Sequence, residues 1–167
     1  GVKVVVDCTG QFLDPTLSMD EAKGSLRGHF KGGAKVVIAS SAFKIKNKAL
    51  NEPPDAVTLI YGVNHHSFQA ARHQLVSAAS CTTTALAHML HPLLENEKTS
   101  RILTASMSTI HAATNSQPVL DNVPAAGDKD LRKSRSVLDN IILTSTNAAK
   151  ALSTVIPEIN DIGFMAE

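Results

Sequence analysis

The sequence is poor in several residue types, and each shortage excludes a class of protein. None of its 167 residues is Trp and only 4% are aromatic, which argues against a surface that stacks nucleic-acid bases. Two cysteines, Cys8 and Cys81, are too few for a disulfide framework and indicate a reducing compartment. A net charge of +1 predicts no general attraction to nucleic acid or to anionic membranes. No apolar run approaches the ~18 residues that a membrane span needs.

Two kinds of binding motif are also missing. The sequence contains no G-x-G-x-x-G and no Walker loop, the glycine-rich turns that cradle a diphosphate. If the chain forms a dinucleotide-binding fold, the opening unit of that fold is absent from it. His88 and His91 could share a helix face, but no carboxylate or cysteine is spaced to complete a zinc site. We therefore expect no metal centre.

The first half of the chain is a series of short apolar runs typical of a mostly parallel sheet. The β-branched run at 2–6 predicts a strand buried on both faces. Further strands are expected at 35–39, 56–60 and 75–79, each ending in small or polar residues, where α/β sheets bind ligands. After the first strand, the capping-box pattern that opens at Ser18 predicts a helix ending near His29.

The pattern changes after residue 81. Residues 101–111 alternate between apolar and polar, which predicts a long half-buried strand of the kind found in antiparallel sheets. Residues 112–133 read as a charged loop, and a helix is expected from Ala148 to just before Pro157. We therefore expect two partial domains, residues 1–81 and 82–167, of α/β and α+β class respectively.

Ser80-Cys81-Thr82-Thr83-Thr84 lies where a predicted strand turns into a predicted helix. A thiol in the first turn of a helix has a lowered pKa, and the free N–H groups there can hold an oxyanion or a phosphate. A buried structural cysteine beside good N-caps would give the same pattern. His111 ends the later strand, and a Cys–His pair that meets in space makes a thiolate nucleophile; the sequence does not show that the two meet. Thr146 and Asn147 precede the last helix as a second anion site or as simple caps.

Together these motifs resemble the phosphorylating glyceraldehyde-3-phosphate dehydrogenase family. The similar segments run in the same order along nearly the whole chain: 5–12, 32–38, 62–65, 80–83, 110–117, 130–142, 144–151 and 155–158. The resemblance implies part of a Rossmann-type parallel sheet that binds NAD, followed by part of a mixed-sheet catalytic domain. It also implies a cytoplasmic glycolytic oxidoreductase that is usually a homotetramer, with the loop at 112–133 reaching a neighbouring subunit's cofactor.

The resemblance also implies roles for individual residues. Cys81 would attack the aldehyde and His111 would act as the base. Thr9, Gly10 and Ser40 would line the cofactor site, with NADP not excluded because the residue that selects the ribose lies outside the sequence. The substrates would be a small aldehyde phosphate and inorganic phosphate. The residues expected to hold their phosphate groups are Ser80, Thr82, Thr114, Thr146 and Asn147.

Departures from the family pattern leave other interpretations open. The family usually has Asn where this chain has Thr84, Gly where it has Asn147, and Pro where it has Leu143. The chain reads as a central fragment that by itself should bind NAD weakly and turn over little substrate. The alternatives are a paralogous enzyme acting on erythrose 4-phosphate or on an aspartate-semialdehyde-type substrate, a non-catalytic binding or assembly module of the same fold, and a Cys–His hydrolase.

Overall fold

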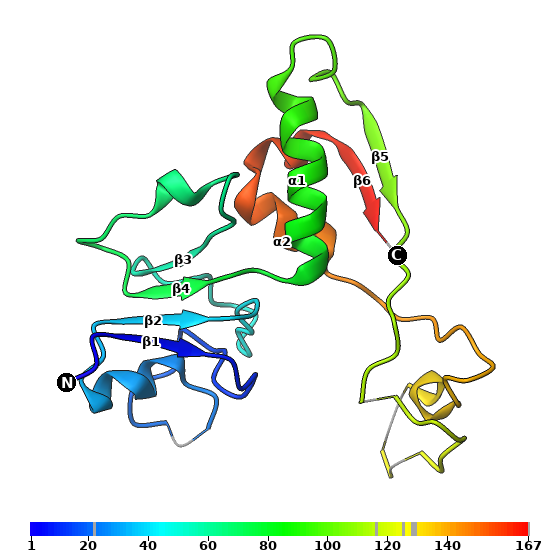
Figure 1. Ribbon diagram of the computed structural model, residues 1–167, viewed down its shortest axis with the longest axis horizontal. Helices are drawn as coiled ribbons and strands as arrows, with labels where there is room; N and C mark the ends of the chain where they lie inside the picture. Colours follow the sequence, from blue (N-terminus) through cyan, green and yellow to red (C-terminus); the bar gives the residue numbers. More distant parts are fainter. Residues whose placement is uncertain (22, 116, 125, 128–129, 167) are drawn as a thin grey trace.

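The computed structural model describes residues 1–21, 23–115, 117–124, 126–127 and 130–166. Within them the first half of the chain forms a four-stranded sheet, whose strands all pair in parallel (Figure 1). In spatial order the strands are β1 (Val4–Asp7), β2 (Val36–Ala39), β4 (Leu75–Ser77) and β3 (Ala56–Thr58). The expected parallel sheet is confirmed. All four strands therefore point in the same direction. The polar segments that follow them gather at the carboxyl end of the sheet, its polar edge.

One face of this sheet is covered by η1 (Leu26–Gly32) and the loop before it, but the other face of β1 is open. The apolar cluster on the covered face contains Leu13, Leu26, Val37, Ala39, Ala56 and Leu75. On β1, Val4 and Val6 are 50% and 58% exposed. The prediction that this strand is buried on both faces is wrong, because β1 is the edge strand and only the face that carries Val5 packs against the cluster.

The helix predicted from Ser18 to His29 does not form; residue 22 lies outside the described residues. The segment instead contains a bridge between Asp14 and Ser25, followed by η1. Gly24 has a positive φ of 88°, which a right-handed helix cannot contain. The capping-box pattern was outweighed by that turn and by the packing of Leu26, which is fully buried.

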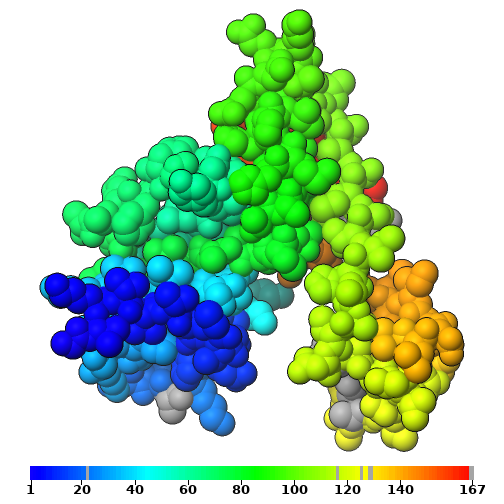
Figure 2. Space-filling view, viewed as in Figure 1, coloured from blue at the N-terminus to red at the C-terminus, as the bar shows by residue number. Residues whose placement is uncertain are grey.

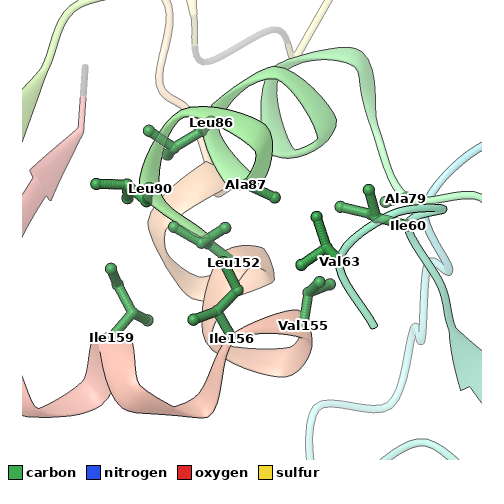
Figure 3. Close-up of a cluster of buried hydrophobic side chains, with 10 residues drawn as sticks. All are labelled: Ile60, Val63, Ala79, Leu86, Ala87, Leu90, Leu152, Val155, Ile156 and Ile159. Carbon is green, nitrogen blue, oxygen red and sulfur yellow. The ribbon is translucent and has the colours of Figure 1, made fainter. Parts of the chain in front are cut away.

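The second half of the chain is built on two helices with a shared apolar core. These are α1 (Cys81–Glu95) and α2 (Ala148–Val155), with η4 (Pro157–Asp161) after them, and both α-helices begin where the sequence predicts. Figure 3 shows side chains from the three elements meeting residues from the end of the first half. The buried members of this second cluster are Ile60, Val63, Ala79, Leu86, Ala87, Leu90, Leu152, Val155, Ile156 and Ile159.

The strand predicted at 101–111 is shorter than expected and pairs differently. It is β5 (Thr104–Met107), and it pairs in parallel with β6 (Gly163–Ala166), so the antiparallel prediction is wrong. Since α2 lies between the two strands in the chain, the connection returns the chain to the same end of the sheet, as parallel pairing requires. The predicted alternation holds only within β5, where Ala105 and Met107 are half-buried and Ser106 is exposed; Leu103, expected on the same face as Ala105, is 83% exposed.

Between β5 and α2 the chain forms an exposed lobe at the lower right of Figure 2. Apart from the short η3 (Leu131–Ser134), its described residues form loops, as predicted. The lobe is held by its own contacts, including an ion pair of 2.9 Å between Arg135 and Asp121. Another short helical turn, η2 (His65–Ser67), follows β3. In the described part of the chain no helix is both long and apolar enough to cross a bilayer.

Candidate active site

The turn between β4 and α1 places Cys81 at the start of a helix. Ala79 has a positive φ of 59°, a left-handed conformation that is uncommon for a residue with a side chain. Ser80 is the N-cap, because its Oγ accepts a hydrogen bond of 3.2 Å from the N–H of Thr83. Cys81 is therefore the first residue of α1, where free N–H groups and the helix dipole favour an anion.

The Cys81 thiol is exposed, and its pKa lies below the usual value for a thiol. The largest cause is a side-chain hydrogen bond with Thr82, whose Oγ1 lies 3.9 Å from Sγ. Partial burial acts in the opposite direction, and a side-chain hydrogen bond and a charge interaction with His111 lower the pKa further. These interactions favour the thiolate, which is the reactive form of cysteine.

His111 is exposed and lies beyond the end of β5 rather than at its last residue. Its Nδ1 donates a hydrogen bond of 2.7 Å to the carbonyl oxygen of Ala112, and this bond is the largest cause of a raised pKa for the imidazole. The interaction with Cys81 raises the pKa again. Because Nδ1 donates to Ala112, Nε2 is the ring nitrogen that remains able to accept a proton from the thiol.

The fold explains how residues so distant in sequence meet. Figure 1 shows β5 running in the opposite direction to α1, with β6 drawn between them, so the chain returns toward the N-terminus of the helix. Ile102, before β5, and Met107, its last residue, pack against the second apolar cluster and so hold β5 against the core that α1 and α2 share. The segment after Met107 therefore delivers His111 to the start of α1.

The three predicted cofactor residues lie together at the polar edge of the first sheet. Thr9 and Gly10 follow β1, and Ser40 follows β2, with its N–H donating a 2.9 Å hydrogen bond to the carbonyl oxygen of Asp7. Gly10 has a positive φ of 69° and open space where a side chain would begin. A ligand can therefore approach the backbone closely at this turn.

The predicted phosphate-binding residues fall into separate groups. Ser80 and Thr82 stand on either side of Cys81. At the start of α2, the Oγ1 of Thr146 accepts a 3.1 Å hydrogen bond from the N–H of Ala148, so it acts as a cap. Asn147 has a φ of −100°, which asparagine adopts without strain in place of the family's glycine. Thr114 lies in the exposed loop beyond His111, where its N–H donates 2.9 Å to the Oε1 of Gln117.

Asp7 and His29 were missed by the sequence analysis. The Asp7 carboxylate is buried, and its Oδ1 accepts hydrogen bonds from both the N–H and the hydroxyl of Thr9, at 2.9 and 2.7 Å. Its Oδ2 lies 2.7 Å from Nε2 of His29. Burial alone would raise the pKa of Asp7, but these bonds hold it below the usual value. The Asp-x-Thr spacing, repeated at Asp14-Pro15-Thr16, is the signal that identifies such a turn.

A metal was not expected, and the described residues contain no group of three or more side chains suited to hold one. His88 and His91 lie on α1 as predicted. His91 is 3.4 Å from Glu95 in a pair four residues apart, and His88 packs beside Gly62.

Comparison with known proteins shows which proteins the chain is similar to. Residues 80–166, just over half of the chain, match the family described as "Glyceraldehyde 3-phosphate dehydrogenase, C-terminal domain". Over 159 residues the chain is 41% identical to glyceraldehyde-3-phosphate dehydrogenase 1 of Bacillus cereus, and 42% identical to that of Bacillus subtilis. A glycosomal glyceraldehyde-3-phosphate dehydrogenase from Crithidia fasciculata is 39% identical over 152 residues.

These relatives are much longer than the chain. The two Bacillus alignments cover 95% of the chain but 40% of each relative, and the Crithidia alignment covers 91% and 36%. The chain thus spans about two fifths of the length of the curated proteins that it resembles.

Proposed function

The chain belongs to the glyceraldehyde 3-phosphate dehydrogenase family, and we propose that, within a protein of its relatives' length, it oxidises glyceraldehyde 3-phosphate to 1,3-bisphosphoglycerate. The reaction uses NAD(P) and inorganic phosphate and belongs to glycolysis. The observation that carries this proposal is the interaction between the Cys81 thiol and the His111 imidazole at the start of α1. A thiol activated in this way is what covalent aldehyde chemistry requires.

Cys81 and His111 divide the first step between them. The imidazole takes the thiol proton, and the sulfur then attacks the aldehyde carbon, forming a C–S bond and an oxyanion. The protonated ring of His111, held through Nδ1 by Ala112, returns a hydrogen bond or the proton to that oxygen and so completes the hemithioacetal. The N–H groups of the first turn of α1 supply further positive potential at this point.

The cofactor residues fit the chemistry of a dinucleotide. Gly10 leaves the backbone open to a ligand, and the Thr9 hydroxyl and the Ser40 side chain stand at the same edge of the sheet. When bound there, NAD(P) supplies the hydride acceptor that converts the hemithioacetal into a thioester. Asp7 fixes Thr9 through two hydrogen bonds, so the edge is rigid before any ligand arrives.

Phosphate then cleaves the thioester and releases Cys81. Ser80 and Thr82 flank Cys81 in the chain, and the Thr82 hydroxyl lies 3.9 Å from the sulfur. We assign the attacking phosphate to these two residues together with Thr146 and Asn147. We assign the substrate's own phosphate to Thr114. Of these, Ser80 and Thr146 also cap helices, so their hydroxyls face the positive ends of α1 and α2.

An assay of the full-length protein tests the proposal. Cys81→Ser is expected to abolish NAD(P) reduction with glyceraldehyde 3-phosphate and phosphate, whereas the matched Cys8→Ser variant retains it. Activity that survives Cys81→Ser contradicts the proposal. Omitting phosphate tests acyl-phosphate formation, and comparing NAD with NADP identifies the cofactor.

The second candidate is oxidation of erythrose 4-phosphate, favoured by the departures at Thr84 and Asn147. A higher kcat/KM for erythrose 4-phosphate than for glyceraldehyde 3-phosphate in the same assay would select it. Loss of both activities, with an unreactive Cys81, would instead favour the non-catalytic module.

The proposal extends to assembly and organisation. We infer a cytoplasmic homotetramer and two partial domains, residues 1–81 and 82–167. The cluster that contains Leu26 and Leu75 lies wholly in the first part, while the cluster around Leu152 joins the second part to Ile60 and Ala79. Light scattering of the full-length protein measures the oligomer.

A further inference from the structure

A buried serine ties the turn before Cys81 to the neighbouring strand. Ser77, the last residue of β4, has a relative exposure of 0%. Its Oγ accepts a hydrogen bond of 3.0 Å from the N–H of Ala79 and donates one of 3.0 Å to the carbonyl oxygen of Ser41. A single hydroxyl therefore satisfies a backbone donor in the turn and a backbone acceptor beyond the end of β2.

The turn that Ser77 holds is strained. Ala79 has a φ of 59°, and among the described residues it alone combines a side chain with a positive φ. Such a conformation persists only where the surroundings fix it. Two contacts do so here: the hydrogen bond from its N–H to Ser77, and the packing of its methyl group, 2% exposed, in the second apolar cluster.

The conformation of Ala79 decides where Cys81 lies. Because Ser80 and Cys81 follow at once, a relaxation of Ala79 to a negative φ would redirect the chain at the N-cap. The sulfur would then move away from the imidazole of His111, which interacts with it. The thiolate would lose the interactions that favour it.

We propose that Ser77 is a positioning residue for the nucleophile: its hydroxyl holds Ala79 in the left-handed conformation that presents Cys81 to His111. This inference rests on the proposed function, in which Cys81 is the nucleophile. Since Ser41 adjoins Ser40, the same hydroxyl also joins the candidate cofactor edge to the nucleophile's turn.

The test is the pH dependence of Cys81 alkylation by iodoacetamide in the 167-residue chain, resolved from Cys8 by peptide mass spectrometry. In Ser77→Ala the N–H of Ala79 loses its acceptor. We expect the midpoint for Cys81 to rise by about one pH unit, so alkylation near pH 7 falls about tenfold while Cys8 is unchanged. The matched control is Ser153→Ala on α2, whose hydroxyl bonds only locally to the carbonyl of Lys150, and it should leave the midpoint in place.

A second substitution separates positioning from general destabilisation. Glycine adopts a positive φ without steric cost, so Ala79→Gly in the Ser77→Ala background should recover at least half of the lost midpoint shift. If the single variant fails to fold, as judged by circular dichroism, the double variant carries the test. A double variant that recovers neither fold nor midpoint overturns the proposal.

The outcomes also distinguish this inference from the function on which it rests. A wild-type Cys81 that titrates like Cys8 overturns the proposed function. A lowered wild-type midpoint that Ser77→Ala does not move overturns only the positioning role of Ser77.

Discussion

The thiol of Cys81 and the imidazole of His111 interact, although Cys81 is the first residue of α1 and His111 follows β5. Each shifts the other's pKa in the direction that favours a thiolate beside an imidazolium. Both side chains remain exposed, so a substrate can reach the sulfur.

Replacing His111 tests this relationship directly. His111→Asn removes the charge and the ring, so the Cys81 pKa should rise toward that of a free thiol. Because iodoacetamide reacts with the thiolate, we expect alkylation of Cys81 at pH 7 to fall about three- to tenfold. His66→Asn, in η2, is the matched control and should leave the rate unchanged; an equal loss in both variants would show that the pairing does not activate the thiol.

Thr82 makes the largest contribution to the lowered pKa of Cys81. Thr82→Val keeps the side-chain shape and removes the hydroxyl, so the alkylation midpoint of Cys81 should move to higher pH. The same change at exposed Thr154 on α2 serves as the control. A Thr82→Val midpoint equal to that of wild type would mean that the 3.9 Å contact contributes nothing.

Asp7 should make stability depend on pH. Its pKa is lowered by folding, so its contribution is present above its unfolded value of about 3.9 and is lost as pH falls through the folded value. Asp7→Asn should therefore lower the free energy of unfolding by about 1–3 kcal/mol at pH 7 in urea denaturation, and the difference from wild type should shrink below about pH 4. Asp20→Asn, at a highly exposed ion pair, should change little. A pH-independent difference would contradict the assignment.

Leu152 joins α2 to α1 and is fully buried. Leu152→Ala should destabilise the chain by about 2–5 kcal/mol in thermal or urea unfolding, because it leaves a cavity in the second apolar cluster. Leu93→Ala, 43% exposed on α1, should cost much less. Similar costs for the two would mean that the cluster does not hold the helices together.

The 167-residue chain should bind NAD weakly. Its candidate cofactor edge offers Thr9, Gly10 and Ser40, while the sequence holds no glycine-rich loop for the diphosphate. Isothermal titration calorimetry is expected to show a dissociation constant above about 1 mM. Micromolar binding would show that these residues suffice.

The sequence predicts the elements that carry a strong local pattern. The β-branched runs became β1, β2 and β3, and the Ser80 cap began α1 where expected. The helix expected after Ser18 failed because Gly24 takes a positive φ, which no capping pattern reveals. The parallel pairing between β5 and β6 depends on a long connection through α2. The periodicity of a single strand carries no information about such a connection.

The candidate site likewise contains residues that the sequence could identify and residues that only the structure identifies. Cys81 and His111 could be selected by chemistry and by resemblance, but their interaction depends on how β5 packs against the core shared by α1 and α2. Ser77 and Ala79 carried no signal at all, because a serine at the end of a strand and an alanine in a turn are ordinary residues. Their importance comes from a backbone angle and two hydrogen bonds that only coordinates disclose.

The valines of β1 have a practical consequence for anyone who purifies this chain. Val4 and Val6 form an apolar stripe on β1, a terminal strand of the four-stranded sheet, and among the described residues no further strand pairs with its outer edge. Such an edge recruits further strands, so concentrated samples should self-associate and precipitate. Dilute handling, or a lysine at position 4, would keep the chain in solution for the titrations.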